Sequence, residues 1–381
     1  MKKLYWRPQR ASLRVLWLVA LLAIGGLFMV EKFRIQEEQP FFREKVRASQ
    51  LAAECFKAIK DERLKRDIPI DPESDPTMSG LVGELLTPVT TNPGHLPSKQ
   101  TAINPNFAAV VVHLLKRIGV APGDVVALGI SGSFPAENIA VLAAIQSLGL
   151  QPILISSVGS SQWGANNPKF LWPEMEQLLY DQHLINFRSV ALSRGGLEDK
   201  ALGMTKEGKE IIDRVIDRSG IAKIEAKSYA ESVERRMEIY LASAGDKGIK
   251  AYINVGGGTA SVGARLGRKL FKPGLNRTMP QGASEIDSVM ARFIANDVPV
   301  IHIMNIDKLA QRYGLPLEPK TMPAVGQGKI FVREVHNRWL ALGATVFLIL
   351  VLIAFVRFDW GYRIFTAGSR ERTSTRPQKM V

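Results

Sequence analysis

Apolar and polar positions alternate along residues 106–330 in a regular order. Short, almost wholly apolar runs predict strands at 125–130, 152–156, 251–255 and 298–304. Amphipathic segments predict helices at 107–118, 136–148, 172–181, 206–219, 228–244, 284–295 and 307–313. Strands that are apolar on both faces and alternate with helices indicate a parallel sheet covered on both sides. We therefore expect an extracytoplasmic α/β domain, doubly wound and mostly parallel, that binds ligands at the carboxyl ends of its strands.

Two uncharged apolar runs lie outside this domain, and each borders a basic segment. A membrane span needs about 20 apolar residues, which predicts transmembrane helices at 15–33 and 339–356. Basic residues favour the cytoplasmic side, so the tails 1–14 and 357–381 are expected in the cytoplasm. A cleavable signal peptide is the alternative for the first run, and a buried helix is the alternative for the second.

Residues 34–105 separate the first span from the predicted domain. Their first half carries apolar residues at helical spacing and predicts a stalk helix leaving the membrane. The second half, from about residue 67, contains too many prolines for long elements. We expect it to wrap the surface of the following domain.

The net charge of +14 belongs mostly to the two ends of the chain. The first 14 residues carry five basic and no acidic side chains, and the last 25 carry six basic and two acidic ones. The central part is therefore only mildly basic, which does not favour nucleic acid as a partner. The single cysteine, Cys55, and five scattered histidines lack any metal-ligand spacing. We expect no metal and no cofactor.

Three predicted strand ends are rich in Gly, Ser and Asn, which let a backbone approach a ligand and offer small donors. The candidate ligand-binding residues are Ser131, Gly132, Ser133, Asn138, Ser160, Ser161, Trp163, Asn166, Asn254, Gly256, Gly257, Gly258, Thr259 and Ser261. Small residues also serve turn geometry alone, and Trp163 could equally pin its loop onto the core. A basic stretch, Arg235, Arg236, Arg265, Arg268, Lys269, Lys272 and Arg277, is either a solvated face or a surface for an acidic polymer.

The first strand end reads GISGSFPAEN from residue 129. Pro135 suits the first turn of a helix and Ser133 is placed to cap it, so the free amides there favour an anion such as a carboxylate. The same stretch resembles the G-x-S-x-G elbow of hydrolases, which makes Ser131 a candidate catalytic nucleophile. His302 is the obvious histidine downstream, with Asp297 and Asp307 as the nearest acids, but it lies within a predicted strand that would hold it rigid. His183 lies in a predicted loop and has no acid in the right order. The triad is incomplete.

Long irregular motifs carry a resemblance to a known family. These are GSFPAENIAVLAAIQSLGLQPILISSVGSSQWGANNP, AYINVGGGTASVG and VPVIHIMNIDKLAQRYGLP, which lie between the two apolar runs. The chain resembles the poly-γ-glutamate system proteins, bacterial membrane proteins associated with the ligase and membrane subunits that make poly-γ-glutamate. The resemblance implies a bacterial cytoplasmic-membrane protein acting in capsule or secreted-polymer biosynthesis or export. It carries no known catalytic residue.

Two functions remain open at the level of sequence. The chain is either an accessory subunit whose crevice binds glutamyl carboxylates, or a serine-dependent amide hydrolase or transferase that processes the polymer. The incomplete triad favours the accessory subunit. Its expected partners are the poly-γ-glutamate ligase and membrane subunits, the polymer and the membrane.

Overall fold

The structure is a computed structural model that describes residues 13–263, 267 and 269–357. Nearly all of the predicted cytoplasmic tails therefore lies outside the described residues, as do Arg265 and Arg268. The chain forms two compact units, one spanning Glu38–Val332 and the other made from the segments on either side of it.

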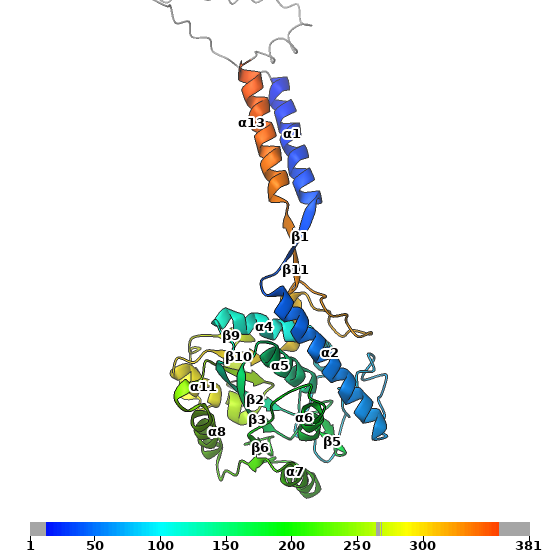
Figure 1. The fold of residues 1–381 in the computed structure, drawn as a ribbon, viewed down its shortest axis with the longest axis vertical. Coiled ribbons are helices and arrows are strands. Elements are labelled where there is room, and N and C mark those ends of the chain that lie inside the picture. Colours follow the sequence, from blue (N-terminus) through cyan, green and yellow to red (C-terminus); the bar gives the residue numbers. More distant parts are fainter. Residues whose placement is uncertain (1–12, 264–266, 268, 358–381) are drawn as a thin grey trace, which may run out of the picture. The chain divides into compact units, whose positions relative to one another are not determined.

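A seven-stranded sheet forms the centre of the Glu38–Val332 unit (Figure 1). Its order is β7 (Ala222–Lys223), β6 (Ala191–Ser193), β3 (Gln151–Ser157), β2 (Val125–Ser131), β8 (Ala251–Val255), β10 (Val300–Ile303) and β9 (Gly274–Asn276). All neighbours are parallel except β9, which runs antiparallel to β10. The expected α/β class with a mostly parallel sheet is confirmed. Three strands were not predicted, because β6, β7 and β9 have only two or three residues each.

Helices cover both faces of this sheet. The helices are α2 (Phe42–Lys65), α4 (Phe107–Ile118), α5 (Pro135–Ser147), α6 (Trp172–Asp181) and α12 (Ile306–Tyr313) on one face, and α8 (Tyr229–Ala244) and α11 (Val289–Ala295) on the other. Alternate residues of β2 serve the two faces: Leu128 packs in the first cluster and Ala127 in the second. Helix α7 (Lys206–Ser219) buries Ile212 against Leu192 in a third cluster. Double-sided burial explains why the strands read as continuous apolar runs.

One predicted helix is divided in two in the structure. The expected helix at 284–295 is a 3-10 turn (Ala283–Glu285) followed by α11. The interruption arises because Ser288 is extended and its hydroxyl accepts a hydrogen bond from the Ala291 N–H at 3.2 Å, which makes it the N-cap of a new helix.

Helix α2 is part of the α/β unit rather than a stalk outside it. Ala48, Ala52, Cys55 and Ile59 are fully buried in the main core. The compact unit therefore starts at Glu38, well before residue 106, because the apolar stripe of α2 is covered by the helices of the sheet.

The proline-rich segment after α2 is fixed to the unit by buried polar groups. The guanidinium of Arg63 donates to the carbonyls of Gly80, Val82 and Pro69 at 2.6–3.0 Å. A Cβ at Gly83 would come within 1.9 Å of the Gly164 carbonyl oxygen, so the two backbones are in direct contact. This contact brings the proline-rich segment against the loop after β3.

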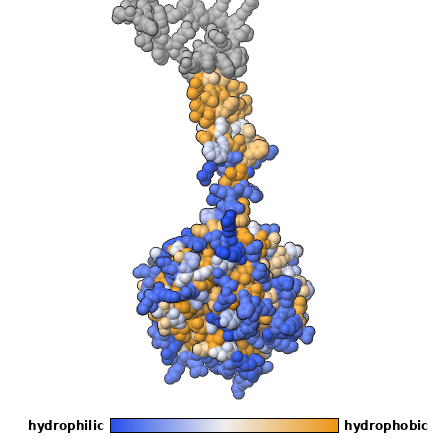
Figure 2. Space-filling model, in the orientation of Figure 1, coloured by the Kyte–Doolittle hydropathy of each residue, from blue (hydrophilic) through white to orange (hydrophobic). Residues whose placement is uncertain are grey.

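The other unit consists of α1 (Leu13–Lys32) and α13 (Arg338–Arg357), which lie side by side, with the short strands β1 (Arg34–Glu38) and β11 (Val332–His336) paired next to them. Among the described residues, one helix, α13, is long enough and apolar enough to cross a membrane. Its window Arg338–Phe355 has a mean hydropathy of 2.3 and none of it is buried. Figure 2 shows that apolar residues predominate on the face of this helix pair that is in view. Such an exposed apolar surface is compatible with membrane association.

Candidate functional site

A pocket lies at the point of the sheet where the strand order reverses. From β2 the chain proceeds to β3, β6 and β7, and then returns to the opposite side of β2 with β8. The pocket has a volume of about 170 Å³ and is lined by the loops that follow β2, β3, β6 and β8, together with residues 91–99. This is where ligands bind in open parallel sheets. The pocket lies at the edge of the sheet where the Gly-, Ser- and Asn-rich strand ends were predicted.

The loop after β2 is held tightly against the loop after β3. The Gly132 N–H donates to the Ser157 carbonyl at 3.0 Å, and the Gly132 carbonyl accepts from the Ala165 N–H at 2.7 Å. A Cβ at Gly132 would lie 2.8 Å from the Val158 carbonyl oxygen, so glycine is required there. The two loops thus form one rigid wall of the pocket.

The prediction that Ser133 caps α5 is wrong. The N-cap is Phe134, which makes no side-chain cap hydrogen bond. The Ser133 hydroxyl instead accepts from the Ser161 N–H at 3.1 Å, so it bonds to the loop after β3. One turn into α5, Asn138 Nδ2 donates to the Ser131 carbonyl at 2.8 Å. Both side chains fix the loop conformation.

Lys99, on the short helix α3 (Leu96–Ala102), reaches from the proline-rich segment into these two loops. Its Nζ lies 3.0 Å from Ser161 Oγ, contacts the Ser133 carbonyl, and stands 3.8 Å above the centre of the Phe134 ring. Lys99 is only 4% exposed, and it lines the pocket. Lys99 was not predicted as a site residue, because a proline-rich segment has no periodic pattern from which the burial of a lysine could be predicted.

Burial lowers the pKa of Lys99 to about 7. The Phe134 ring and the Ser133 carbonyl favour the ammonium form, but removal from water disfavours it more strongly. No carboxylate of the described residues pairs with Lys99. Near neutral pH the amine and ammonium forms are therefore both well populated.

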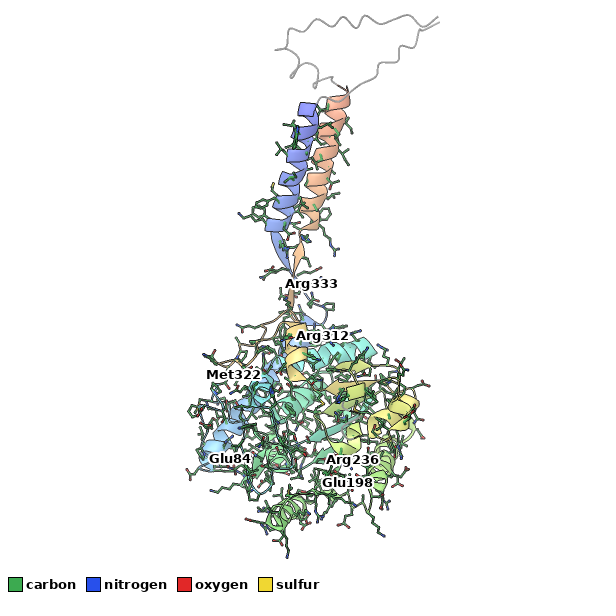
Figure 3. All side chains as sticks on the ribbon, turned by 180° about the vertical axis from the view of Figure 1, so that it is seen from behind. Glu84, Glu198, Arg236, Arg312, Met322 and Arg333 are labelled. Atoms are coloured by element: carbon green, nitrogen blue, oxygen red, sulfur yellow. The ribbon has the colours of Figure 1, made fainter. Side chains whose placement is uncertain are left out.

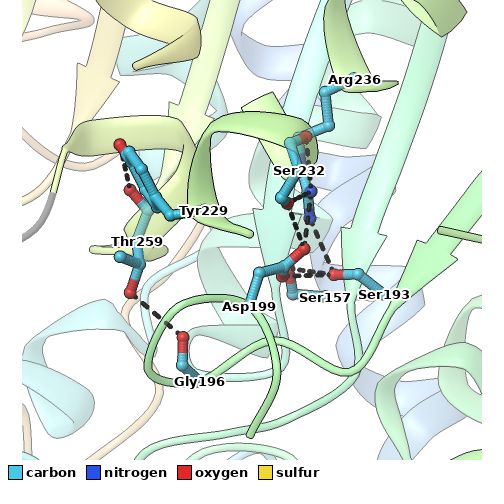
Figure 4. A network of polar contacts seen from close by, with 8 residues as sticks. All are labelled: Ser157, Ser193, Gly196, Asp199, Tyr229, Ser232, Arg236 and Thr259. Carbon is cyan, nitrogen blue, oxygen red and sulfur yellow. Dashed lines mark hydrogen bonds and ion pairs between the residues drawn. The ribbon is translucent and has the colours of Figure 1, made fainter. Parts of the chain in front are cut away.

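The second cation at the pocket, Arg236 on α8, is already neutralised (Figure 4). Its Nη1 lies 2.7 Å from Asp199 Oδ2 and 2.6 Å from Ser232 Oγ, and its Nη2 lies 2.8 Å from Ser193 Oγ. The Ser193 hydroxyl donates to Asp199 Oδ1 at 2.7 Å and lies 3.0 Å from Ser157 Oγ. Both charged side chains are only 6% exposed.

This network fixes the loop after β6 against α8. Figure 3 labels Arg236 on α8 and Glu198, which precedes Asp199 in this loop. Glu198 and Asp199 both have positive φ, 52° and 60°, so the loop adopts a conformation that ordinary residues seldom take. The ion pair between Asp199 and Arg236 connects this loop to α8.

The end of β8 carries a chain of buried polar groups. The Asn254 side chain joins Ser261 Oγ on one side and His302 Nδ1, 2.9 Å away, on the other. Ser261 Oγ also contacts the Tyr252 hydroxyl. Thr259, in the same loop, donates from its hydroxyl to the Gly196 carbonyl at 3.1 Å. These bonds place the glycine-rich loop beside the loop after β6.

Eight of the residues predicted to bind ligand line the pocket. They are Ser131, Ser133, Ser161, Asn254, Gly257, Gly258, Thr259 and Ser261. The other six, Gly132, Asn138, Ser160, Trp163, Asn166 and Gly256, are not among the lining residues.

These six hold the walls of the pocket in place. Asn166 exchanges hydrogen bonds with the backbone of Glu84, and the backbone of Trp163 accepts from Gly83 and donates to Glu84. Ser160 Oγ donates to the Gly132 carbonyl at 3.0 Å. The Trp163 side chain is partly buried and packs against the main core, which is the contact that the pinning role requires.

The hydroxyl of Ser131 lacks a basic neighbour among the described residues. It accepts a long bond, 3.4 Å, from the Ser133 N–H. His302 is buried in β10, where burial lowers its pKa to about 4, and it does not line the pocket. His183 is exposed just after α6. Neither histidine completes a triad with Ser131.

The predicted basic stretch does not form one surface in the described part of the chain. Arg235 is exposed and pairs with Glu238, whereas Arg236 is buried. Arg277 contacts the carbonyl of Arg117. The ion pair between Arg236 and Asp199 was not predicted, because it depends on where the loop after β6 lies in the folded chain. Among the described residues, no group of three or more His, Cys, Asp or Glu side chains is placed to hold a metal ion.

Comparison with protein-family models finds no family that matches the chain. Comparison with curated proteins likewise finds no match. Among solved structures, the chain aligns with an archaeal alanine:glyoxylate aminotransferase at 10% identity, over 91% of this chain and 70% of that chain, with a TM-score of 0.16. This TM-score lies far below that of a shared fold, so the fold and the site stand on their own geometry.

Proposed function

We propose that the chain is an accessory membrane subunit of bacterial poly-γ-glutamate biosynthesis or export, and that its pocket binds γ-glutamyl carboxylates. The motifs at the three strand ends support the family assignment. One structural observation supports the ligand: Lys99 lies in a hydroxyl-rich pocket without a carboxylate partner among the described residues. A carboxylate is the ligand that such a lysine lacks.

The charge balance of the pocket favours a single anionic group. Asp199 neutralises Arg236, which leaves Lys99 as the unneutralised lysine or arginine among the described lining residues. The volume of about 170 Å³ is below the roughly 300–1,000 Å³ of sites for drug-sized ligands. The pocket therefore suits one glutamyl unit of a chain rather than a long stretch of polymer.

The helix pair supports a membrane location in this proposal. Helix α13 is one span, and α1 is the second, so that both termini lie in the cytoplasm and the α/β unit lies outside it. The ligase and membrane subunits of polymer synthesis are the partners. A reporter fused after Lys379 is expected to be active only if it functions in the cytoplasm, and activity of an exported-only reporter at that position would contradict the orientation.

Equilibrium binding of a γ-glutamyl oligomer to the full-length protein tests the ligand. The control ligand is the same oligomer with its carboxylates converted to amides. Lys99→Met is expected to weaken binding roughly ten- to hundredfold, because a charge-assisted hydrogen bond contributes about 1.5–3 kcal/mol. The exposed Lys206→Met is the matched control. Equal affinity for the acidic and the amidated oligomers would refute carboxylate recognition.

A further inference from the structure

Among the serines that line this pocket, Ser161 is the one whose hydroxyl contacts a basic side chain, that of Lys99. Its Oγ lies 3.0 Å from Lys99 Nζ. The Ser161 backbone is fixed on both sides, since its N–H donates to Ser133 Oγ at 3.1 Å and its carbonyl accepts from Ser160 Oγ at 2.9 Å. Ser161 is half-buried and lines the pocket. A fixed, accessible hydroxyl next to an amine is the arrangement of a serine nucleophile with a general base.

We propose that Ser161 and Lys99 form a nucleophile and base pair that transfers an acyl group from an amide or ester bond placed in the pocket. The pair rests on the geometry alone. The choice of a γ-glutamyl amide as the bond that it attacks rests on the proposed function.

The surroundings of Lys99 allow the amine to act as a base. Lys99 Nζ donates to the Ser133 carbonyl and lies 3.0 Å from Ser161 Oγ. When the amine is neutral, its lone pair can accept the Ser161 hydroxyl proton across this contact. Burial lowers the pKa of Lys99 to about 7, so the neutral amine is available near neutral pH. The other ionisable side chains that line the pocket are His95, Asp199, Arg236 and Tyr252.

The reaction follows from these positions. Ser161 Oγ attacks the carbonyl carbon while its proton passes to Lys99 Nζ, which gives a tetrahedral oxyanion and an ammonium. Lys99 returns this proton to the leaving amine as the carbon–nitrogen bond breaks, and an ester with Ser161 remains. Water, or the amine of an acceptor, then attacks the ester, its proton passes through Lys99 to Ser161 Oγ, and the free enzyme is restored. No oxidant, metal or nucleotide is consumed.

Neighbouring serines are less suited to this role. Ser131 Oγ has no basic contact among the described residues, and Ser133 Oγ is occupied by the Ser161 N–H. Ser160 Oγ is buried and donates to the Gly132 carbonyl.

Labelling of the full-length protein with a fluorophosphonate tests the pair, because this probe modifies serines activated by a base and carries no carboxylate. Mass spectrometry is expected to find the adduct on Ser161. The labelling rate is expected to rise about tenfold from pH 6 to pH 8, which is the change in neutral amine for a pKa near 7. Lys99→Arg, which keeps the charge but cannot act as a base, is expected to lower the rate at least a hundredfold.

Matched controls are Ser243→Ala and Lys206→Arg, both at exposed positions, which are expected to label as the wild type does. Ser161→Cys gives a second measurement: its thiol is expected to react rapidly with iodoacetamide, whereas Cys55, the single native cysteine, is buried with its pKa raised to about 12. Labelling of Ser131 instead, no labelling of the folded wild type, or full labelling of Lys99→Arg would overturn the proposal.

The outcome separates this proposal from the binding function. Labelling of Ser161 without binding of the γ-glutamyl oligomer would support the nucleophile and overturn the proposed ligand. Binding of the oligomer without labelling of Ser161 would support the accessory subunit and overturn the nucleophile. Release of free amine from the oligomer by the wild type but not by Lys99→Arg would support both.

Discussion

Replacing Lys99 by methionine is expected to remove a pH dependence from the stability of the α/β unit. In the folded chain the pKa of Lys99 is about 7, and unfolding returns it to 10.5. Between these values the unfolded chain binds more protons than the folded chain, so the free energy of unfolding rises with pH. The free-energy cost of burying the Lys99 ammonium is greatest below pH 7 and disappears above the pKa of the unfolded chain.

The magnitude follows from these two pKa values. Each pH unit well inside the window adds about 1.4 kcal/mol to the free energy of unfolding. From pH 7 to pH 9 the gain is about 2 kcal/mol, because the folded lysine is only half protonated at pH 7. Lys99→Met lacks this gain, while every other group, including Lys45 with a pKa of about 8, titrates in both proteins and cancels in the difference.

Pulse proteolysis in urea at pH 7, 8 and 9 measures the free energy of unfolding of both full-length proteins. From pH 7 to pH 9, the free energy of unfolding of the wild type is expected to rise by about 2 kcal/mol relative to that of Lys99→Met. Lys206→Met, at an exposed position, is expected to follow the wild type. A constant difference between wild type and Lys99→Met at all three pH values would refute a depressed lysine pKa.

Three further substitutions test the walls and the core. Asp199→Asn leaves Arg236 buried without its counter-ion, and is expected to lower the free energy of unfolding in urea by about 3–5 kcal/mol. Gly132→Ala places a methyl group 2.8 Å from the Val158 carbonyl and is expected to cost about 1–3 kcal/mol in the same assay. Neither carboxylate oxygen of Glu137 has a partner among the described residues, and burial raises the pKa of this carboxyl well above its ordinary value of 4.5. The wild type therefore loses stability as pH rises above the unfolded pKa, and Glu137→Gln is expected to be increasingly more stable than the wild type over the same pH rise. No change in any one of these measurements would contradict the corresponding contact.

Much of the fold could be predicted because its main signals are local. A strand buried on both faces must be apolar at every position, as in β2, whose seven residues are nearly all buried. The predicted strands and most predicted helices agree with the structure within a few residues. The shortest strands escaped prediction because two residues cannot carry a periodicity.

The sequence predicted where the pocket lies, but only some of the residues that line it. A strand that ends in small polar residues indicates where a parallel sheet binds ligands, and eight of the fourteen predicted ligand contacts line the pocket. The remaining six have the same composition, but they contact other loops. Residue type alone does not distinguish a lining residue from one that holds the wall behind it.

The sequence by itself determined the sheet class, the apolar ends and the edge of the sheet at which the pocket forms, since hydrophobic periodicity and turn composition are read over a few neighbouring residues. Tertiary structure alone decided the chemistry. Lys99 is 62 residues from Ser161 and Asp199 is 37 residues from Arg236 along the chain, and these contacts exist only because the loops converge. Desolvation of Lys99 depends in the same way on what surrounds it in space, so a lysine that is ordinary in sequence becomes a base in the folded chain.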